Sequence, residues 1–515
     1  MTSPDAASPI VVIGAGLGGL AAACTLAARG HAVTVCEAND WLGGKAAEWR
    51  SSGYRFDMGP TILTVPRVLE RIFGEADVKM ADRLDLRRLD PQWRCFFEDG
   101  TRIDLCDDID AMVRRLDELC TGDGDGYRNL IAASQKLHEI SERFFFWKSV
   151  GGVMDTLDLG TTFNAATLRD VLALRMDSTL GREIRRRIRD RRTVQMLDHF
   201  TQYVGSNPLQ APAVLTGIAH MQVNDGVWYP MGGTRAVPKA LVDLARELGV
   251  VFRPGTRIKR ILQQHGRATG IETTHGEIIP ARAVVSNMDS VRTMRELVEG
   301  VDTRRFERQW GRRRPACSGV VLYLGLDRAY DHLAHHDFVF SGNPEEEFDA
   351  IYKRGVPAED PTCYLAAPAR TDPAVAPPGG EALYVLVHTP YIRRGQNWHE
   401  MFPHYRQVIL DKLKRCAGLT DIEARIRVEH HLTPLDIHNR YSPLRGAIYG
   451  LASHGRLNGA FKPANRAREL DGLYLAGGAA HPGAGMPMAL MSGWIAADCA
   501  DHDLPAVNAG KRIQA

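Results

Sequence analysis

The feature that most constrains the fold of this chain is a glycine-rich segment at residues 12–19, VIGAGLGG. An apolar run at residues 11–13 predicts a buried strand before it, and a run of small residues predicts a helix after it. Gly14 would permit the tight turn, Gly16 would let the backbone approach a pyrophosphate, and Gly19 would let helix and strand pack closely. With Gly18 beside them, these glycines predict a dinucleotide site whose phosphates contact free amides at the start of the helix.

An acidic residue, Glu37, follows a second predicted strand at residues 31–36. It stands where a ribose hydroxyl of the dinucleotide would lie, and it disfavours the 2′-phosphate of NADPH. Gly43 and Gly44 come shortly afterwards and would let the chain pass close to ribityl and pyrophosphate groups. Lys45 would then contact a phosphate or the ribityl chain, unless it is an ordinary exposed loop lysine. These residues favour FAD as the cofactor.

The C-terminal part of the chain contains a second unit of this kind. A strand at residues 472–478 ends in Gly477 and Gly478, a glycine-rich turn follows, and a helix is expected over residues 489–499. The positive end of a helix dipole at this turn would suit the electron-rich N1/C2 edge of a flavin. The cofactor-binding residues expected here are Gly477, Gly478, Gly485, Met486 and Pro487. One cofactor held by both ends of the chain would place the two ends in one domain.

With these motifs in this order, the chain resembles the flavin-dependent phytoene desaturase family of carotenoid enzymes. The C-terminal turn and residues 446–450 look most similar to hydroxyneurosporene and methoxyneurosporene dehydrogenases, whereas residues 228–233 are closer to the phytoene-desaturating branch. YPMGG at 229–233 is also shared by the wider amine-oxidase-like flavoproteins. The segments that carry the resemblance are FDMGPT at 56–61, YVGSNP at 203–208, YPMGG at 229–233, VSNMD at 285–289 and GGAAHPGAGMP at 477–487.

The resemblance implies an α/β fold in which a Rossmann-like FAD-binding domain of the amine-oxidase-like flavoprotein type is interleaved with a mixed-sheet and helical substrate domain. The FAD domain would take residues 1–75, 225–300 and 435–500, and the membrane-facing substrate domain would take 76–224 and 301–434. Residues 501–515 would form a C-terminal tail. Further cofactor contacts are expected from Gly59, Pro60, Thr61 and the backbone around Ile258.

The activity implied by the resemblance is FAD-dependent desaturation of an acyclic carotenoid, specifically 3,4-desaturation of a 1-hydroxylated or 1-methoxylated one. Oxygen or a quinone would accept the electrons. Three alternatives stay open: a phytoene-type multi-step desaturase, an oxidase or oxygenase acting on a terminal methyl group, and a cis–trans isomerase. Because bound FAD would carry the difficult step, few acid–base residues are expected.

Three residues are candidates for catalysis or for shaping the site. His481 lies in the glycine-rich turn and could orient the flavin or accept a proton, although it could equally cap the turn through backbone hydrogen bonds. Tyr203 would shape a substrate tunnel. Tyr229 would cover the flavin or act as an ordinary packing residue. No metal site is expected, because adjacent histidines at 335–336 and 430–431 would point to opposite faces of their strands.

Composition limits the partners. A formal net charge of +2 gives no general case for binding nucleic acid, and the nine scattered cysteines indicate reduced thiols in the cytoplasm. No apolar run is long enough to span a bilayer. The aromatic cluster at 144–147 and the seven arginines between 182 and 192 could instead form a face that docks on the inner side of the cell membrane, where a lipid-soluble carotenoid would be found. An aromatic core plug beside a solvated basic helix is the alternative.

Overall fold

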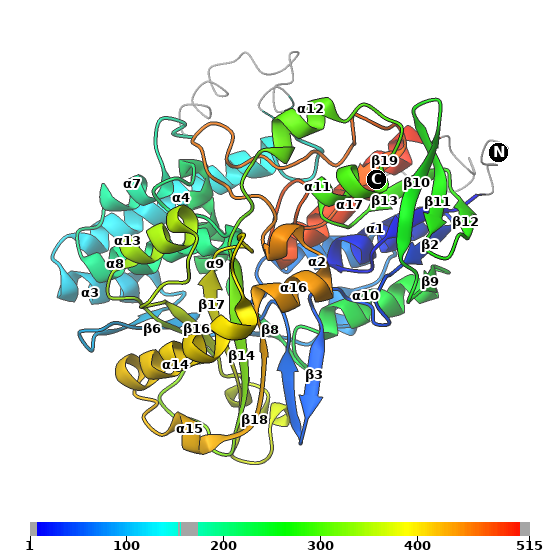
Figure 1. Cartoon of the computed structure of the whole chain (residues 1–515). Helices are drawn as coiled ribbons and strands as arrows, with labels where there is room; N and C mark the ends of the chain where they lie inside the picture. The colour runs from blue at the N-terminus through cyan, green and yellow to red at the C-terminus, as the bar shows by residue number, and fades with distance from the viewer. Residues whose placement is uncertain (1–7, 153–154, 156–173, 505–515) are drawn as a thin grey trace.

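The computed structural model describes residues 8–152, 155 and 174–504. Its central element is a five-stranded parallel sheet (Figure 1). Its strands come from both ends and the middle of the chain, in the order β19-β13-β1-β2-β9. Their bounds are β1 Ile10–Ile13, β2 Val33–Cys36, β9 Val251–Arg253, β13 Ala283–Ser286 and β19 Leu473–Leu475. The parallel sheet therefore has the composition that the two glycine-rich units predict.

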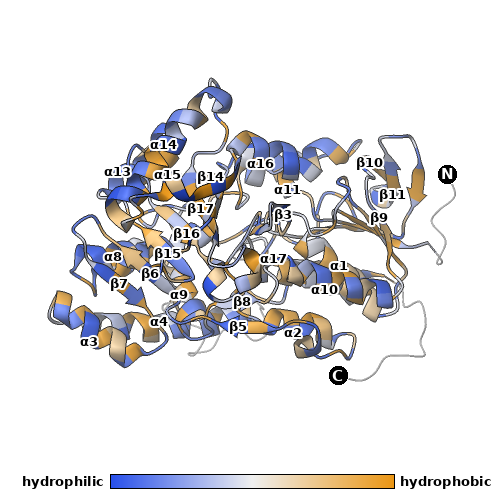
Figure 2. Ribbon diagram, turned by 90° about the horizontal axis from the view of Figure 1, so that it is seen from below, coloured by the Kyte–Doolittle hydropathy of each residue, from blue (hydrophilic) through white to orange (hydrophobic). Residues whose placement is uncertain are grey.

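Both faces of this sheet are covered by other elements (Figure 2), and every residue of β1 and β13 is buried. Ile10 and Val12 of β1 pack with the helices α1, α2, α10 and α17, and the alternate residues Val11 and Ile13 pack on the opposite face against a small antiparallel sheet. The helices are α1 Leu17–Ala28, α2 Arg67–Gly74, α10 Ala236–Glu247 and α17 Met486–Asp503; the small sheet is β10 Ile258–Gln264, β11 Arg267–Thr273 and β12 Ile278–Pro280.

A seven-stranded mixed sheet forms the second half of the molecule, in the order β18-β14-β17-β16-β15-β6-β7. Alternate residues of β14 separate its two faces. Val320 and Leu322 pack on one side with α14, and Val321 and Tyr323 face the other side, where α3, α4, α7, α8 and α9 lie. The strands are β6 Trp93–Phe96, β7 Arg102–Leu105, β14 Ser318–Leu326, β15 His336–Val339, β16 Cys363–Ala366, β17 Glu381–Thr389 and β18 Ile426–Leu432.

The remaining elements connect these layers. Four further strands form two short antiparallel pairs, β3 with β4 and β5 with β8. The helices are α3 Ile109–Leu119, α4 Asp123–Phe144, α7 Leu180–Arg185, α8 Arg191–Asp198, α9 Gly217–Val223, α11 Ser290–Arg292, α12 Arg304–Phe306, α13 Pro344–Phe348, α14 Trp398–Ala417, α15 Ile422–Arg425 and α16 Pro434–Tyr441, and the strands are β3 Glu48–Ser51, β4 Tyr54–Asp57, β5 Leu86–Arg88 and β8 Trp228–Pro230.

The C-terminal helix begins three residues earlier than the sequence pattern indicates. Helix α17 starts at Met486, and Pro487 lies in its first turn. Proline is well tolerated there because its missing N–H would have no partner within the helix. Three residues that were expected in a turn, Met486, Pro487 and Met488, therefore belong to the helix end, where free backbone amides point outward.

The two ends of the chain meet where α17 crosses the start of α1. A Cβ atom added at Gly493 would lie 2.0 Å from the backbone oxygen of Gly18, and backbone cannot yield as a flexible side chain can. We expect Gly493→Ala to lower the free energy of unfolding by about 1–3 kcal/mol through overpacking. Denaturant unfolding followed by tryptophan fluorescence measures this change.

The matched control is Gly74→Ala at the end of α2, where an added Cβ would meet nothing within 4 Å. Stability there should be unchanged or rise by up to about 1 kcal/mol, because alanine loses less conformational entropy than glycine. Equal effects of the two substitutions would show that α1 and α17 are not packed as closely as the structure has them.

Candidate FAD and substrate cavity

One cavity of about 1040 Å³ runs from the carboxyl ends of the parallel strands to the space between the seven-stranded sheet and α4 and α9. Ligand pockets usually measure about 300–1000 Å³, so this cavity lies at the upper end of that range. Its walls come from segments far apart in the sequence, including the glycine-rich turn after β1, the loop after β19 and helix α9.

The first glycine-rich turn leaves no space for side chains. A Cβ atom at Gly18 would lie 2.7 Å from the backbone nitrogen of Gly477, and one at Gly44 would lie 2.9 Å from the Cα atom of Gly16. Helix α1 begins directly after Gly16, and no side chain caps its first turn. The backbone amides of this twelve-residue helix are therefore available to an anionic ligand.

Glu37 closes one side of this turn at the end of β2. Its carboxylate accepts hydrogen bonds from the backbone N–H groups of Ala15, at 2.8 Å, and Asn39, at 2.9 Å. The side chain is buried, yet it lines the cavity. Two backbone donors hold the carboxylate beside the phosphate-binding turn, which leaves its remaining acceptor sites for the hydroxyls of a ribose.

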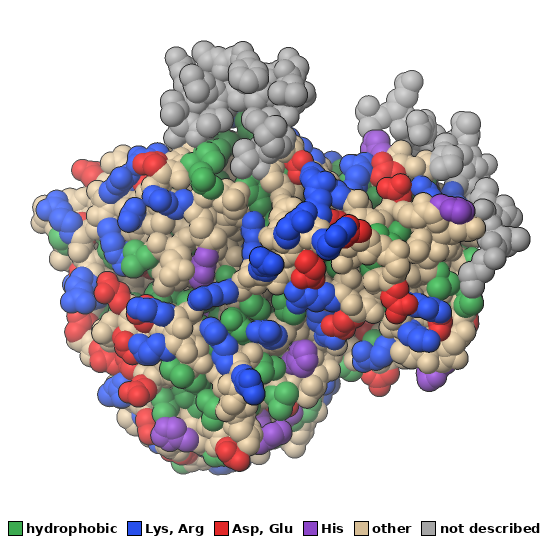
Figure 3. Space-filling view, turned by 45° about the horizontal axis from the view of Figure 1, so that its top comes forward, with side chains coloured by type: hydrophobic (Ala, Val, Ile, Leu, Met, Phe, Trp, Pro, Cys, Tyr) green, Lys and Arg blue, Asp and Glu red, His purple; other side chains and the backbone are tan. Residues whose placement is uncertain are grey.

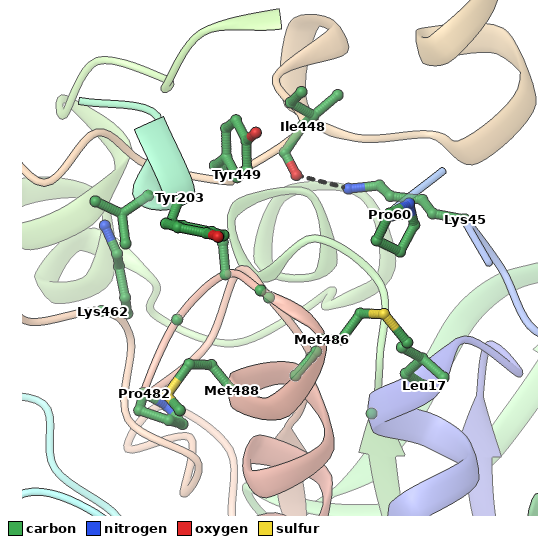
Figure 4. Close-up of a pocket in the computed structure, with 18 of the residues that line it drawn as sticks. Leu17, Lys45, Pro60, Tyr203, Ile448, Tyr449, Lys462, Pro482, Met486 and Met488 are labelled. Carbon is green, nitrogen blue, oxygen red and sulfur yellow. Dashed lines mark hydrogen bonds between the residues drawn. The ribbon is translucent and has the colours of Figure 1, made fainter. Parts of the chain in front are cut away.

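Lys45 lies on the opposite wall from α17 and is one of the few cations in this part of the cavity (Figure 4). Its Nζ atom donates a hydrogen bond to the backbone oxygen of Ile448 at 3.0 Å. Burial lowers the pKa of this amine to about 8, and the nearby Asp289 carboxylate opposes that shift. Gly59 packs against the backbone oxygen of Lys45, where a Cβ atom would lie at 2.0 Å. Lys45 is thus a half-buried donor on the cavity wall, not an exposed loop lysine.

The sequence-predicted cofactor residues converge on this cavity. All of those outside the helix–strand contact line it: Gly14, Gly16, Gly18, Glu37, Gly43, Gly44, Lys45, Gly59, Pro60, Thr61, Ile258, Gly477, Gly478, Gly485, Met486 and Pro487. Gly19 lies behind the turn, where a Cβ atom would approach the backbone oxygen of Gly14 to 2.0 Å. That contact corresponds to the close helix–strand packing expected of the third glycine.

The donor set fits FAD. A turn without side chains suits the pyrophosphate, a buried carboxylate at its edge suits a ribose, and the second helix end at Gly485 suits the flavin ring. A cavity that continues past α17 leaves a substrate space beside that ring position. When bound, FAD supplies the redox chemistry that amino-acid side chains lack.

His481 does not line this cavity, although the sequence suggested it as a catalytic residue. Its ring is fully buried and packs on Phe145 with 4.4 Å between ring centroids, and its Nε2 atom lies 2.8 Å from the backbone oxygen of Phe145. Burial lowers the pKa of the imidazole to about 4, so it is neutral at physiological pH. The geometry corresponds to the alternative role, a histidine that fixes the turn.

Tyr229 also lies away from the main cavity. Its ring packs on His335, and its hydroxyl lies 3.2 Å from a carboxylate oxygen of Asp372 in a cluster with Arg55. Tyr203 does line the cavity, and its hydroxyl donates to the side-chain oxygen of Gln222 at 2.7 Å. Of the three candidates, only Tyr203 is therefore placed to contact a ligand in this cavity.

We expect His481→Phe to affect stability more than catalysis. The substitution keeps an aromatic ring against Phe145 but removes the hydrogen bond to its backbone oxygen. An unpaired buried carbonyl would cost about 1–3 kcal/mol of unfolding free energy. The kcat per bound FAD should stay within about threefold, a change of less than 1 kcal/mol in the barrier.

Calorimetry and product formation normalised to flavin content separate these two effects. A loss of kcat of about a hundredfold or more, with FAD content and stability retained, would restore His481 to the chemistry.

Several cavity residues were not singled out in the sequence. Asn287 stands at the crossing of the two glycine turns, and its family-like segment VSNMD was the one available signal. His388 and Tyr449 form a hydrogen-bonded pair, 3.0 Å from Nε2 to the hydroxyl, inside the cavity wall. Lys462 is a buried amine on the same wall (Figure 4). Tyr449 belongs to the family-like segment at 446–450, whereas His388 and Lys462 belong to no recognisable motif, so only the fold brings these two to the cavity.

The aromatic segment at 144–147 and the arginine-rich segment at 182–192 do not form a simple docking face of apolar and free cationic side chains. Phe144, Phe145 and Phe146 line the cavity. The arginines pair with nearby carboxylates: Arg185 with Asp198, Arg186 and Arg187 with Glu183, and Arg192 with Asp190 and Asp99. Much of the expected positive charge is therefore neutralised locally, which reduces its attraction to an anionic bilayer.

Two further observations concern the described parts of the chain. None of the helices in residues 8–152 and 174–504 combines the length and apolar character needed to cross a bilayer. Within the same residues, no group of three or more histidine, cysteine, aspartate or glutamate side chains is arranged to hold a metal ion. The adjacent His335 and His336 instead lie in a packed aromatic region beside Tyr364 and Tyr229.

Comparison with known proteins agrees with this fold. The sequence profile described as "Flavin containing amine oxidoreductase" matches residues 17–500. The chain is 39% identical over 496 residues to a 4,4'-diapolycopene oxygenase from Methylomonas sp, covering 96% of this chain and 98% of that protein. It is 37% identical over 489 residues to a 4,4'-diaponeurosporene oxygenase from Staphylococcus aureus, covering 95% and 97% respectively.

Solved structures share the fold at low sequence identity. An oxidoreductase from Methanosarcina mazei superposes with a TM-score of 0.62 at 18% identity, covering 94% of this chain and 98% of that one. Cyclohexylamine oxidase from Brevibacterium oxydans has a TM-score of 0.59 at 15% identity, with coverage of 96% and 99%. The predicted amine-oxidase-like flavoprotein fold and the FAD cofactor are confirmed. The chain is an FAD-dependent oxidoreductase that belongs to the flavin containing amine oxidoreductase family.

Proposed function

We propose that this enzyme oxidises a terminal methyl group of an acyclic carotenoid with dioxygen as co-substrate. The observation that carries the proposal is similarity over almost the whole chain to two proteins that are both named as oxygenases of 4,4'-diapo-carotenoids. This corresponds to the oxygenase alternative left open by the sequence. The same names do not support 3,4-desaturation of a hydroxylated or methoxylated carotenoid, which was the first interpretation.

The shape and lining of the cavity support a long apolar substrate. Beyond the α17 turn, the walls carry apolar side chains from two layers: Ile140, Phe144, Leu215, Ile218 and Met221 on the helical side, and Val321, Phe338, Leu386 and Leu432 on the sheet side. A polyene offers no hydrogen-bonding groups, so burial of apolar surface is its main source of binding energy. A rigid, conjugated chain would be held along this channel with one end beside the flavin position.

The ionisable groups in the channel are suited to neutral chemistry. Burial lowers the pKa of His388 to about 4, and it also holds the pKa of His199 well below the ordinary value. Both imidazoles are therefore uncharged at physiological pH. The channel residues position the substrate, exclude water and supply neutral donors and acceptors, while the oxidation itself depends on bound FAD.

Product analysis in cells that accumulate an acyclic carotenoid tests the proposal. We expect each oxidised end to gain one oxygen atom and lose two hydrogen atoms, as a methyl group becomes an aldehyde. A desaturase would instead remove two hydrogen atoms without adding oxygen, and only in the presence of a carotenoid 1-hydratase if it needs a hydroxylated end. An isomerase would change the retention time and leave the mass unaltered. Either of these results would overturn the oxygenase proposal.

We further propose that the enzyme is a peripheral protein of the inner face of the cell membrane, with the predicted interleaved domain division. The space-filling view shows Lys and Arg side chains interspersed with hydrophobic ones across one face (Figure 3). Leu457, which lines the cavity, is 57% exposed, so this wall reaches the surface. A lipid-soluble substrate could enter there directly from the bilayer. Co-sedimentation with anionic vesicles measures this association.

A further inference from the structure

Lys462 is a buried amine on the cavity wall. Its side chain belongs to a residue that is 3% exposed, and it lines the cavity. The Nζ atom donates hydrogen bonds to the backbone oxygen of Leu451 at 2.5 Å and to the hydroxyl of Ser453 at 2.8 Å. These two bonds fix the position of the amine.

The charge of Lys462 is not balanced by a carboxylate. Among the described residues no aspartate or glutamate forms an ion pair with it, and both of its hydrogen-bond acceptors are neutral. Burial lowers its pKa to about 7, and the positive charge of Arg313 adds to that shift. Taking a cation out of water without a partner is costly, so a position of this kind needs an explanation.

The hydrogen-bonding capacity of Lys462 is also not exhausted. An ammonium group has three N–H donors, and the hydrogen bonds to Leu451 and Ser453 use two of them. In the protonated form of Lys462, the third donor can serve a ligand in the cavity, and a bound acceptor would in turn favour that form. A hydrocarbon end offers no acceptor for it, whereas a carbonyl oxygen does.

Lys462 lies beside the turn that leads into α17. A Cβ atom at Gly483 would be 3.7 Å from the Cγ and Cε atoms of Lys462, and Pro482 and Gly483 line the cavity with it. Figure 4 shows Lys462 between Pro482 and Tyr203, with its amine toward Tyr203, on the side of the cavity away from Lys45. A chain end that reacts near this turn would therefore come within the neighbourhood of the lysine.

We infer that Lys462 is the binding site for the oxygenated end of the chain, donating its third N–H to the carbonyl oxygen of a terminal aldehyde. The inference rests on the proposed function and extends it, because it assigns the residue that distinguishes an oxidised end from an unreacted one. The ligand of this subsite would be a polyene that carries a carbonyl group at its end. The two fixed hydrogen bonds to Leu451 and Ser453 hold the donor in place, so little entropy is lost when the aldehyde binds.

Direct binding measurements test this assignment. Oxidised holoenzyme is titrated, without turnover, with an acyclic polyene aldehyde and with the hydrocarbon of the same chain length. We expect Lys462→Met to weaken aldehyde binding by about 10- to 100-fold, the range for a hydrogen bond to a charged group, and to leave hydrocarbon binding unchanged. The absorption band of the aldehyde should shift to longer wavelength on binding to the wild type and lose that shift in the variant.

Two further variants separate recognition from folding. Lys462→Gln keeps N–H donors and should keep part of the preference for the aldehyde, which also protects the test if Lys462→Met does not fold. Lys353→Met, at an exposed lysine, is the matched control and should change nothing. Equal weakening of both ligands, or no weakening of either, would overturn the inference and leave Lys462 as a structural tie for its loop.

The outcome is independent of whether the enzyme makes an aldehyde, because the ligand is supplied. Wild-type enzyme that binds the aldehyde through Lys462 yet forms none from the hydrocarbon would refute the proposed function and leave this inference standing. If the enzyme produces the aldehyde but Lys462→Met binds the aldehyde as tightly as the wild type does, the proposed function stands and this inference is refuted.

Discussion

Replacing Glu37 with alanine should leave a folded protein that does not retain FAD. The carboxylate is buried at the edge of the phosphate-binding turn and accepts hydrogen bonds from the backbone of Ala15 and Asn39. Its removal leaves these donors unpaired and removes the acceptor for the ribose hydroxyls. Because hydrogen bonds to a charged group contribute about 1.5–3 kcal/mol each, we expect the Kd for FAD to rise by at least about a hundredfold.

Flavin absorbance per protein chain after gel filtration measures the loss, and a titration of the apoprotein with FAD measures the affinity. Glu277→Ala is the matched control, because that carboxylate pairs with Arg253 on the exposed surface near the same edge. Glu277→Ala should purify with full flavin content. Retention of FAD by Glu37→Ala with an unchanged Kd would show that the ribose is held elsewhere.

Replacing Ile218 with tryptophan should abolish turnover of long polyenes while FAD stays bound. Ile218 lines the apolar part of the cavity on α9. That helix cannot move aside easily, since the Ser134 hydroxyl donates to the backbone oxygen of Thr216 at 2.8 Å and accepts from the N–H of His220 at 2.6 Å. The larger ring must therefore project into the channel. We expect kcat/KM to fall by about a hundredfold or more, equal to about 2.7 kcal/mol of lost transition-state stabilisation.

The control for the added ring is Leu209→Trp, at a leucine that is 44% exposed and does not line the cavity. It should retain wild-type kcat/KM and flavin content. Anaerobic reduction of the flavin by dithionite should proceed alike in both variants, because the FAD part of the cavity is unchanged. Wild-type turnover by Ile218→Trp would mean that the carotenoid takes another path.

The residues predicted for the cofactor half of the site lie together on one cavity because that half is built from backbone. Glycines at 14, 16, 18 and 477 report directly on places where the chain cannot carry side chains, and this requirement is local in sequence. The position of Glu37 is also local, because one strand–turn–helix–strand unit joins it to the first glycine-rich turn. The parallel sheet and its interleaved assembly follow from the same two units at the ends of the chain.

The substrate half could not be predicted in this way. His481 lies in the glycine-rich turn, yet its ring turns toward the backbone of Phe145, and the sequence does not encode that direction locally. Tyr229 is held by Asp372, which is 143 residues away in sequence. Lys462 and His388 reach the cavity only because β17 and the loop before β19 meet there. Such residues are placed by long-range packing, which a single sequence does not show.

The activity, like the substrate half of the site, is harder to predict from the sequence than the cofactor is. The motifs identify a flavoenzyme, whereas oxidation of a methyl group and desaturation of the chain need the same cofactor and a similar channel. The difference lies in which carbon stops beside the flavin. That position is set by a few side chains along the channel and by the group that receives the chain end.

The most direct test of the account uses purified holoenzyme, an acyclic carotenoid hydrocarbon in vesicles, a reductant, and dioxygen labelled with oxygen-18. The aldehyde product is reduced in place with borohydride before its oxygen can exchange with water, and the resulting alcohol is analysed by mass spectrometry. If the enzyme is an oxygenase of the terminal methyl group, the terminal oxygen carries the label from dioxygen. An unlabelled oxygen derived from water, or a product with an additional double bond and no oxygen, would contradict the oxygenase proposal.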